Sequence, residues 1–576
     1  MTDLRGPSRR EFLAASTAAA AATALPGLAL AQPAAPAPPP PPPPSPAAAA
    51  SGITAEMVAA AEKLAGIEFT PAKREMLAKS IGDQIERFKH RQTQPLPANT
   101  LAPALTFDPR LPGMKLDGVQ RPIVRTAAPM PLPDVPGDDE AIAFAPVKVL
   151  SRWIEARALT STRLTEIYLE RLKRLDSKLR FVITLTEDLA RRQAARADSE
   201  IAAGTYRGPL HGIPWGAKDL LDTAGIRTTW GAEPYVDRVP MHDATVVKKL
   251  EEAGAVLAAK TTLGALAYGD IWHGGRTNNP WNIEKGSSGS SAGSAAAVAS
   301  GCVGFAIGTE TLGSIISPSR VCGSTGLRPT FGRVSRAGAM ALCWSLDKIG
   351  PMARCSEDTA LVLAAINGYD AQDSCSLDMP FNFDAGAALK GLRVGYIPAA
   401  FERPNLHSAH KQCLELLRAA GCELVEFSLP EWPFDVLMNI LVCEGAAAFE
   451  ELTRPGTDDT LKWQAPEAWP NTFRETWFVP GVELVQSHRF RRQCMNMMKE
   501  KMEGVDLVLD PTNTGPLCII TNNTGHPSLT IRVGFGDDGL PRATTLVGRL
   551  FDEGALIRVG NVLEAGLGVW EKRPVL

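Results

Sequence analysis

The sequence predicts an α/β protein in which helices cover both faces of a central sheet, with a helical extension in front. Two observations predict the sheet and its helices. Helical patterns at 154–172 and 187–203 alternate with short apolar runs at 255–258 and 303–307, and such runs between helices are typical of buried strands. A third observation, apolar residues at helical spacing over 53–91, predicts the extension.

The first 31 residues resemble a twin-arginine export signal. An arginine pair at Arg9 and Arg10 precedes an alanine-rich apolar stretch, which ends in the small-x-small pattern of residues 29–31. A cytoplasmic amphipathic tail and a retained membrane anchor are the alternatives; Pro26 and Gly27 make this stretch a poor spanning helix. We therefore expect contact with the twin-arginine export machinery, a periplasmic or secreted location and no stable membrane anchor.

Residues 32–50 are dominated by proline and alanine, which predicts a semi-rigid linker rather than a ligand for a proline-binding domain. Residues 51–148 are predicted to form the helical and wrapping extension. Within it, Thr70 and Pro71 are expected to be an N-cap and a first helical residue. The proline-rich part from residue 92 onward contains no pattern that indicates a catalytic or binding site. Residues 149–576 are predicted to be the catalytic domain.

Composition excludes several classes of function. The formal net charge of -3 gives no basic stripe for nucleic acid. All 10 cysteines lie at or beyond Cys302 without a CxxC pair, so neither a zinc ribbon nor a thioredoxin-like site is predicted. Most are expected to be buried thiols, because twin-arginine cargo folds before export. No cofactor or metal is expected, and the oligomeric state stays open.

Three segments carry the candidate chemistry. The first ends in Gly-Ile-Pro-Trp-Gly-Ala-Lys-Asp at 212–219. Lys218 follows a small apolar run, so we expect it to be poorly solvated, which lowers the pKa of an amine and lets it act as a base. The alternative is an ordinary salt bridge between Lys218 and Asp219, because structural lysines outnumber catalytic ones.

The second segment, 286–298, is rich in glycine and serine and includes Ser290. Glycines allow close backbone approach, and the hydroxyls supply several donors and acceptors. A flexible linker is the alternative, but the alanine-rich helical continuation disfavours it. In the third segment, 304–318, an apolar strand runs into a tight turn at Ser314, and Ser317 and Pro318 are predicted to begin a helix. An ordinary strand-to-helix connection remains the alternative there.

The order of these three segments resembles that of the amidase signature family. The resemblance runs from about residue 149 to the C-terminus and includes Asn-Pro-Trp at 279–281, the stretch 326–335 and Asn-Thr-Gly-His-Pro at 523–527. It implies the amidase signature fold, with a mixed, twisted sheet. It also implies hydrolysis of a small-molecule or peptide amide, in a manner similar to peptide amidases.

The resemblance assigns a role to each candidate residue. Lys218 takes the position of the base, Ser290 that of the bridging serine and Ser314 that of the nucleophile, which forms an acyl-enzyme. The bridging serine is expected to follow a cis peptide bond from Gly289. The backbone N–H groups expected to hold the oxyanion belong to Thr311, Leu312, Gly313 and Ser314.

This chain departs from the family pattern at three positions. The family often has Asp at Glu310, Gly at Leu312 and Arg at Ile316. Leu312 adds bulk near the oxyanion turn, and Ile316 removes a charge. Two other functions remain open: an amidotransferase-type subunit that supplies ammonia to a partner, which the export signal disfavours, and an inactive amidase-like binding protein, which the intact Lys-Ser-Ser set disfavours.

Other sequence motifs suggest alternative sites, but each lacks a feature that such a site requires. Residues 289–293 fit G-x-S-x-G with Ser291 in the middle, but no strand precedes them directly as a hydrolase elbow requires. Two S-x-x-K matches, 345–348 and 408–411, lack companion motifs. His407 and His410 are expected on a solvated helix surface rather than at a metal. The side chains of Trp230, Trp272 and Trp344 are candidates either for an acyl pocket or for the core.

Overall fold

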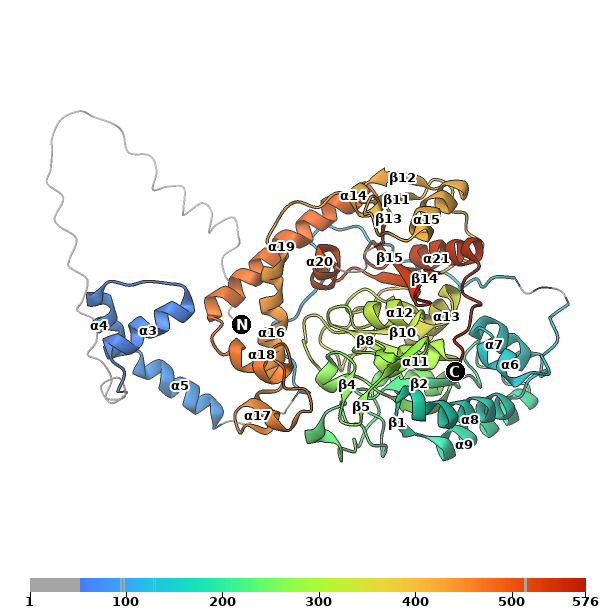
Figure 1. Cartoon of the computed structure of the whole chain (residues 1–576), viewed down its shortest axis with the longest axis horizontal. Coiled ribbons are helices and arrows are strands. Elements are labelled where there is room, and N and C mark those ends of the chain that lie inside the picture. The colour runs from blue at the N-terminus through green and yellow to red at the C-terminus, as the bar shows by residue number, and fades with distance from the viewer. Residues whose placement is uncertain (1–51, 94–95, 97–98, 128, 130, 512–514) are drawn as a thin grey trace, which may run out of the picture. The chain divides into compact units, whose positions relative to one another are not determined.

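The computed structural model describes residues 52–576, apart from 94–95, 97–98, 128, 130 and 512–514 (Figure 1). The predicted export signal at 1–31 and the linker at 32–50 lie outside the described residues. Contacts divide the described residues into two compact units, one of residues 52–63 with 67–93 and one of residues 64–66 with the described part of 94–576. The candidate chemistry lies wholly in the second, larger unit.

The helical pattern of the extension is confirmed as three helices, α3 (Ala55–Ala65), α4 (Pro71–Ser80) and α5 (Gly82–Gln92). Pro71 is the first residue of α4, as predicted, and its fixed φ suits that position. Thr70 is the N-cap residue, but its side chain makes no capping hydrogen bond.

The larger unit contains the remaining helices of the described chain. The α-helices are α6 (Asp139–Phe144), α7 (Val147–Glu155), α8 (Ser161–Leu179), α9 (Glu187–Ala202), α10 (Thr245–Glu252), α11 (Ala292–Ala299), α12 (Ile316–Cys322), α13 (Ser356–Ile366), α14 (Pro398–Phe401), α15 (Ser408–Ala419), α16 (Met438–Ala448), α17 (Glu450–Thr453), α18 (Trp469–Thr476), α19 (Gly481–Glu503), α20 (Pro516–Thr524) and α21 (Glu553–Leu567). Short 3₁₀ turns occupy Glu233–Tyr235, Ala265–Ala267, Phe434–Leu437 and Thr457–Thr460.

Within the described residues, 11 strands form one sheet in the order β1-β3-β2-β8-β10-β9-β14-β15-β13-β11-β12. The strands are β1 (Val182–Leu185), β2 (Pro214–Lys218), β3 (Val256–Thr261), β8 (Phe305–Glu310), β9 (Thr325–Arg328), β10 (Lys348–Ala353), β11 (Arg393–Tyr396), β12 (Glu423–Glu426), β13 (Leu507–Asp510), β14 (Ser528–Phe535) and β15 (Pro541–Gly548). Two small two-stranded sheets pair β4 (Ile271–Trp272) with β5 (Gly275–Arg276) and β6 (Asn278–Asn279) with β7 (Asn282–Gly286).

The central sheet is mixed, as the resemblance implies. β2 runs parallel to both β3 and β8, whereas β10 runs antiparallel to β8 and β9. The expected strands at 255–258 and 303–307 are confirmed as β3 and β8. Because β2 and β8 are parallel neighbours, the residues at their carboxyl ends are brought to the same edge of the sheet.

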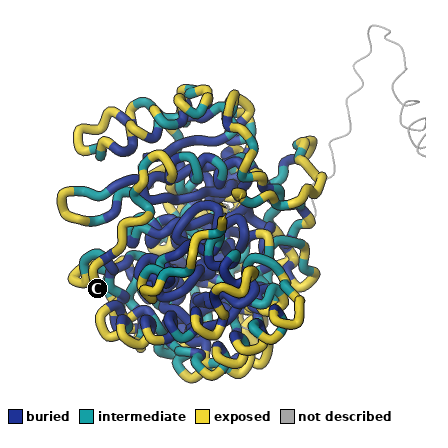
Figure 2. Tube along the Cα trace, turned by 90° about the vertical axis from the view of Figure 1, so that its right-hand side faces the viewer, coloured by how far each residue is buried: buried dark blue, intermediate teal, exposed yellow. Residues whose placement is uncertain are grey.

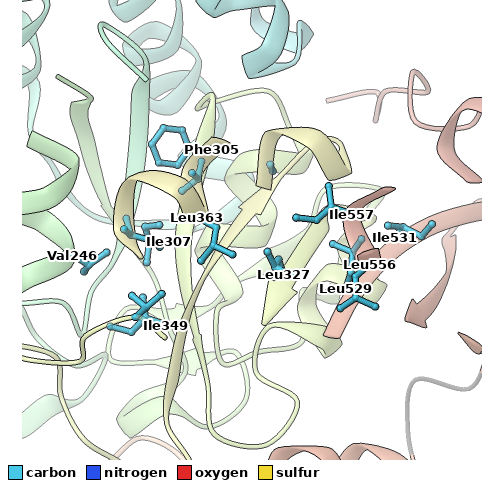
Figure 3. Close-up of a cluster of buried hydrophobic side chains, with 14 of the residues drawn as sticks. Val246, Phe305, Ile307, Leu327, Ile349, Leu363, Leu529, Ile531, Leu556 and Ile557 are labelled. Carbon is cyan, nitrogen blue, oxygen red and sulfur yellow. The ribbon is translucent and has the colours of Figure 1, made fainter. Parts of the chain in front are cut away.

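Helices cover both faces of this sheet. On one face Leu529 and Ile531 of β14 pack against Leu556 and Ile557 of α21, as Figure 3 shows. On the other face α12 lies close to β9, because Gly326 has no side chain; a Cβ there would come within 2.2 Å of Ser319 Oγ. Figure 2 shows buried segments gathered inside the larger unit and exposed segments around them. This close packing of α12 against β9 fixes the position of the turn that precedes the helix.

The prediction of a single helix at 154–172 is wrong. It divides into α7 and α8, separated by residues 156–160, and Arg157 has a φ of 59°. Thr160 begins the second helix, because its side chain accepts a hydrogen bond from the N–H of Arg163 at 3.1 Å. A local capping interaction thus overrides continuous apolar periodicity.

Thr160→Ala is expected to lower the free energy of unfolding by about 1 kcal/mol, because the N–H of Arg163 loses its capping acceptor. Urea unfolding of the two proteins measures this. Ser177→Ala is the control, since Ser177 is exposed on the same helix and its replacement should change stability by less than about 0.5 kcal/mol. Equal losses in both variants would contradict the capping role.

The proline-rich segment from residue 99 onward runs along the larger unit. The N–H of Val124 donates to Phe383 O at 2.9 Å, and Thr126 Oγ1 donates to the buried Glu357 at 2.7 Å. Near the start of this segment, the Asn99 side chain binds the backbone of Ala341. These bonds join residues more than 200 positions apart.

Candidate active site

Lys218 is the last residue of β2, and its side chain is fully buried, with 0% exposure. Its Nζ lies 2.8 Å from Ser290 Oγ, 3.0 Å from Ser291 Oγ and 2.8 Å from Thr309 Oγ1. Thr309 O lies at 3.3 Å. The amine is therefore surrounded by neutral oxygen atoms.

Burial holds the pKa of Lys218 well below its usual range, although the carboxylates of Asp347 and Glu310 oppose this effect. Among the described residues Lys218 forms no ion pair. Asp219 instead pairs with the buried Lys260, whose Nζ lies 3.2 Å from Oδ1. The interpretation of Lys218 and Asp219 as an ordinary salt bridge is therefore wrong, because Asp219, the residue after β2, has the ammonium group of Lys260 as its partner.

The turn after β8 is held by Glu310. Its Oε2 accepts hydrogen bonds from the N–H groups of Ile315 and Ile316, at 2.8 and 2.9 Å. The helix therefore begins at Ile316, and the prediction of Ser317 as its N-cap is wrong. The buried carboxylate, rather than a serine hydroxyl, satisfies the free donors of the first turn.

Glu310 is itself fixed by a buried network. Arg328 donates to its Oε1 at 2.6 Å, and Asn522 donates to the same oxygen at 3.0 Å. Burial raises the pKa of this carboxyl, but the charges of Arg328 and Lys348 outweigh burial and lower it. An ionised carboxylate thus anchors the turn.

The turn leaves backbone donors open. Within the described part of the chain, no hydrogen bond uses the N–H groups of Thr311, Leu312, Gly313 or Ser314. Gly313 has a φ of 83°, a conformation that glycine adopts without steric cost. The hydroxyl of Thr311 donates to Asp347 Oδ1 at 2.6 Å, which fixes the start of the turn. Such a turn can receive a negatively charged oxygen.

The loop that carries Ser290 lies against this turn. The N–H of Ser291 donates to the carbonyl oxygen of Ser314 at 3.1 Å. Ser290 is 1% exposed and Ser314 is 8% exposed. The peptide bond between Gly289 and Ser290 is cis, which confirms the expectation. Lys218, Ser290 and the turn of Ser314 are thus brought together from β2, the loop before α11 and the turn after β8.

A cavity of about 410 Å³ reaches this region. Its wall includes Thr309, Thr311 and Trp344, together with residues 99–102. Of the three tryptophans considered as pocket residues, only Trp344 lines this cavity; Trp230 and Trp272 are 5% and 8% exposed and belong to the core. Lys218, Ser290 and Ser314 line neither this cavity nor a larger one of about 1110 Å³ elsewhere in the unit; the smaller cavity reaches the site through Thr309 and Thr311.

The competing patterns do not form sites. Ser291 is preceded by β7, which belongs to a small separate sheet, and its buried Oγ donates to Thr309 O, so it is not at a strand-to-helix elbow. Ser345 Oγ binds Glu444 rather than Lys348. His410 is only 5% exposed, so its predicted place on a solvated surface is wrong. All ten cysteines are free thiols and eight are buried, as expected.

Sequence reasoning missed three residues that shape the site: Thr309, Lys260 and Arg328. Thr309 lies next to the end of β8, and β8 is the parallel neighbour of β2. Because the carboxyl ends of parallel strands meet at one edge, the place of Thr309 near the end of the predicted strand could have indicated that its hydroxyl lies at the site. Lys260 and Arg328 acquire their roles only through pairing with Asp219 and Glu310.

The fold and this arrangement define an amide-hydrolysing class of α/β enzyme, in which a buried lysine and serine lie beside a strand-to-helix turn. The chain belongs to the amidase family. The family model described as Amidase matches residues 163–517, more than half of the chain.

Relatives and solved structures agree with this membership. The chain is 33% identical over 475 residues to a glutamyl-tRNA(Gln) amidotransferase subunit of Heliobacterium modesticaldum, covering 73% of this chain and 96% of that protein. It is 35% identical over 456 residues to the corresponding protein of a Roseiflexus species, covering 70% and 93%. The native peptide amidase of Stenotrophomonas maltophilia superposes with a TM-score of 0.66 and 31% identity, covering 75% of this chain and 98% of that one.

Proposed function

We propose that this chain is an exported amidase that hydrolyses a carboxamide to a carboxylate and ammonia or an amine. Ser314 is the nucleophile, Ser290 the bridge and Lys218 the base. One observation carries the proposal: a fully buried lysine lies 2.8 Å from a serine hydroxyl, with no carboxylate partner among the described residues. Burial lowers the pKa of a lysine so placed and thereby favours the neutral amine, which can accept a proton.

The reaction then follows from this arrangement. Lys218 Nζ accepts the proton of Ser290 Oγ while Ser290 accepts that of Ser314, and Ser314 Oγ attacks the amide carbonyl. The four open N–H groups of residues 311–314 stabilise the oxyanion. The relay returns the proton to the nitrogen of the leaving group, and the C–N bond breaks. Water, activated by the same relay, releases the carboxylate product from Ser314.

The substrate class and the export route are parts of the same proposal. The similarity to a peptide amidase supports a peptide-amidase-like member that acts on non-peptide or C-terminal amides. The arginine pair and the cleavage pattern of residues 1–31 support periplasmic or secreted activity. Within the described residues, no helix is long and apolar enough to cross a membrane.

The proposed role of Lys218 as the base predicts how kcat/KM depends on pH. kcat/KM is expected to rise about tenfold per pH unit below the pKa of Lys218 and to level off above it, because only the neutral amine accepts a proton. Since burial lowers this pKa, the plateau should begin well below the usual range of a lysine. Rates on a panel of peptide amides, aryl amides, aliphatic amides and carbamates measure this. A kcat/KM that falls as the pH rises toward the expected plateau would contradict the assignment.

A second function has specific support, because the curated relatives named above are amidotransferase subunits. In that case the same site would release ammonia to a partner protein. The two functions separate in one assay. An independent amidase turns over simple amides as the purified chain alone, whereas a partner-dependent subunit releases ammonia from glutamine only after its partner is added.

A further inference from the structure

The segment at the start of the larger unit is tied by one buried side chain to the wall of the 410 Å³ cavity, which Thr309 and Thr311 also line. Asn99 Nδ2 donates to Ala341 O at 2.6 Å, and the N–H of Ala341 donates to Asn99 Oδ1 at 2.6 Å. Trp344 Nε1 donates to Asn99 O at 3.3 Å. Asn99 is 5% exposed, so its amide replaces water at both groups of Ala341.

The residue type suits this position. Asn99 has a φ of 57°, in the left-handed region where asparagine is among the more tolerated non-glycine residues. The amide side chain of asparagine supplies both an acceptor and a donor to one peptide unit. We call these three hydrogen bonds, between Asn99 and residues 341 and 344, the Asn99 clamp.

The clamp places residues 99–102 on the wall of the 410 Å³ cavity. The same wall contains Thr309, whose hydroxyl contacts Lys218, and Thr311 at the start of the oxyanion turn. Small-molecule sites span about 300–1,000 Å³, so this cavity is near the lower end. Leu101 and Ala102 add apolar surface to it.

The charged groups of the same wall are already engaged. Arg336 pairs with Asp373 at 2.7 Å. Asp347 accepts hydrogen bonds from the Thr311 hydroxyl and from the N–H groups of Leu342 and Cys343. Lys348 lies 3.4 Å from Thr311 O, and burial lowers its pKa to about 7. A charged substrate group would therefore have to displace an existing partner.

We infer that the 410 Å³ cavity receives the substrate through its Thr309 and Thr311 side, that the Asn99 clamp limits its size, and that the substrate is a compact, uncharged amide rather than a long peptide amide. This inference rests on the proposed function and names its substrate class. Asn99 acts by positioning the wall; it takes no part in the chemistry.

The test compares butanamide and benzamide with a blocked tetrapeptide amide. The parent should prefer the two compact amides. Asn99→Gly keeps the left-handed backbone accessible but removes the side-chain hydrogen bonds to Ala341 and a longer one, of 3.5 Å, to Ala448 O. It should raise the kcat/KM ratio of tetrapeptide amide to benzamide about tenfold. Leu105→Ala is the control, since Leu105 is 92% exposed in the same segment, and it should leave the ratio unchanged.

Hydrogen exchange of the peptide containing Ala341 gives a second measurement that is independent of turnover. Asn99→Gly should accelerate exchange there, and Leu105→Ala should not. A parent that prefers the tetrapeptide amide, an unchanged ratio in a folded Asn99→Gly protein, or unchanged exchange at Ala341 would each overturn the inference. Failure of the proposed function looks different: the Ser314→Ala protein would keep whatever amide turnover the parent has.

Discussion

Ser314→Ala is expected to reduce kcat for amide hydrolysis by about 10⁶-fold if Ser314 is the proposed nucleophile, because only binding and oxyanion stabilisation are then left. The loss should appear in kcat rather than in KM, since the hydroxyl acts in the reaction step. Product release measured by ammonia or amine assay, with a fluorophosphonate label on the parent as a second readout, checks this result. The label should be absent from the variant.

Two neighbouring serines serve as a control and as a test of the rival nucleophile. Ser317→Ala, three residues further along the chain, should keep the activity and the label, because its hydroxyl lies outside the proposed relay. Ser291→Ala tests the rival nucleophile. Activity that survives in Ser314→Ala and disappears in Ser291→Ala would show that the nucleophile is misplaced.

Glu310→Ala is expected to lower the free energy of unfolding by about 3–5 kcal/mol, because it leaves Arg328 as an unpaired buried charge. Both side chains of this pair are 0% exposed. The same change removes the acceptor for the N–H groups of Ile315 and Ile316, so the turn of Ser314 should loosen and kcat should fall as well. Denaturant unfolding and amide turnover measure the two effects.

The matched control is Glu166→Ala, which breaks an ion pair with Arg191 at the surface, where the two side chains are 40% and 44% exposed. Its cost should stay below about 1 kcal/mol, because water screens exposed pairs. Glu310→Asp keeps the charge and should recover part of the stability lost in Glu310→Ala. A Glu310→Ala cost no greater than that of Glu166→Ala would contradict the anchoring role.

Much of the site was predictable because its signals are local. The small apolar run before Lys218 indicated a buried amine, and the lysine is fully buried at the end of β2. The apolar run before Ser314 indicated a strand entering a turn, and β8 ends at Glu310. Glycine and serine before an alanine-rich helix indicated a close-packed loop, and Ser290 lies in it. Each of these signals depends on residues within one element and its flanks.

Helix boundaries were less predictable, because they depend on which donor or acceptor reaches the first turn. Thr160 ends the apparent helix at 154–172 by capping a new one. Ser317 was expected to begin α12, but Glu310 accepts from the free N–H groups of Ile315 and Ile316, so the N-cap lies two residues earlier, at Ile315. A carboxylate that folds back onto the helix following its own strand leaves no periodic trace in the sequence.

The sequence by itself determined the class of fold, the buried amine of Lys218, the turn at Ser314 and the order of the three segments that carry the chemistry. Only the tertiary structure decided which partners these residues have. Strand order makes β8 the neighbour of β2 and so places Thr309 beside Lys218, while Asp219 turns to Lys260. Asn99 reaches Ala341 across 242 positions. Periodicity reports neighbours within an element, whereas these contacts arise from the packing of elements distant in the chain.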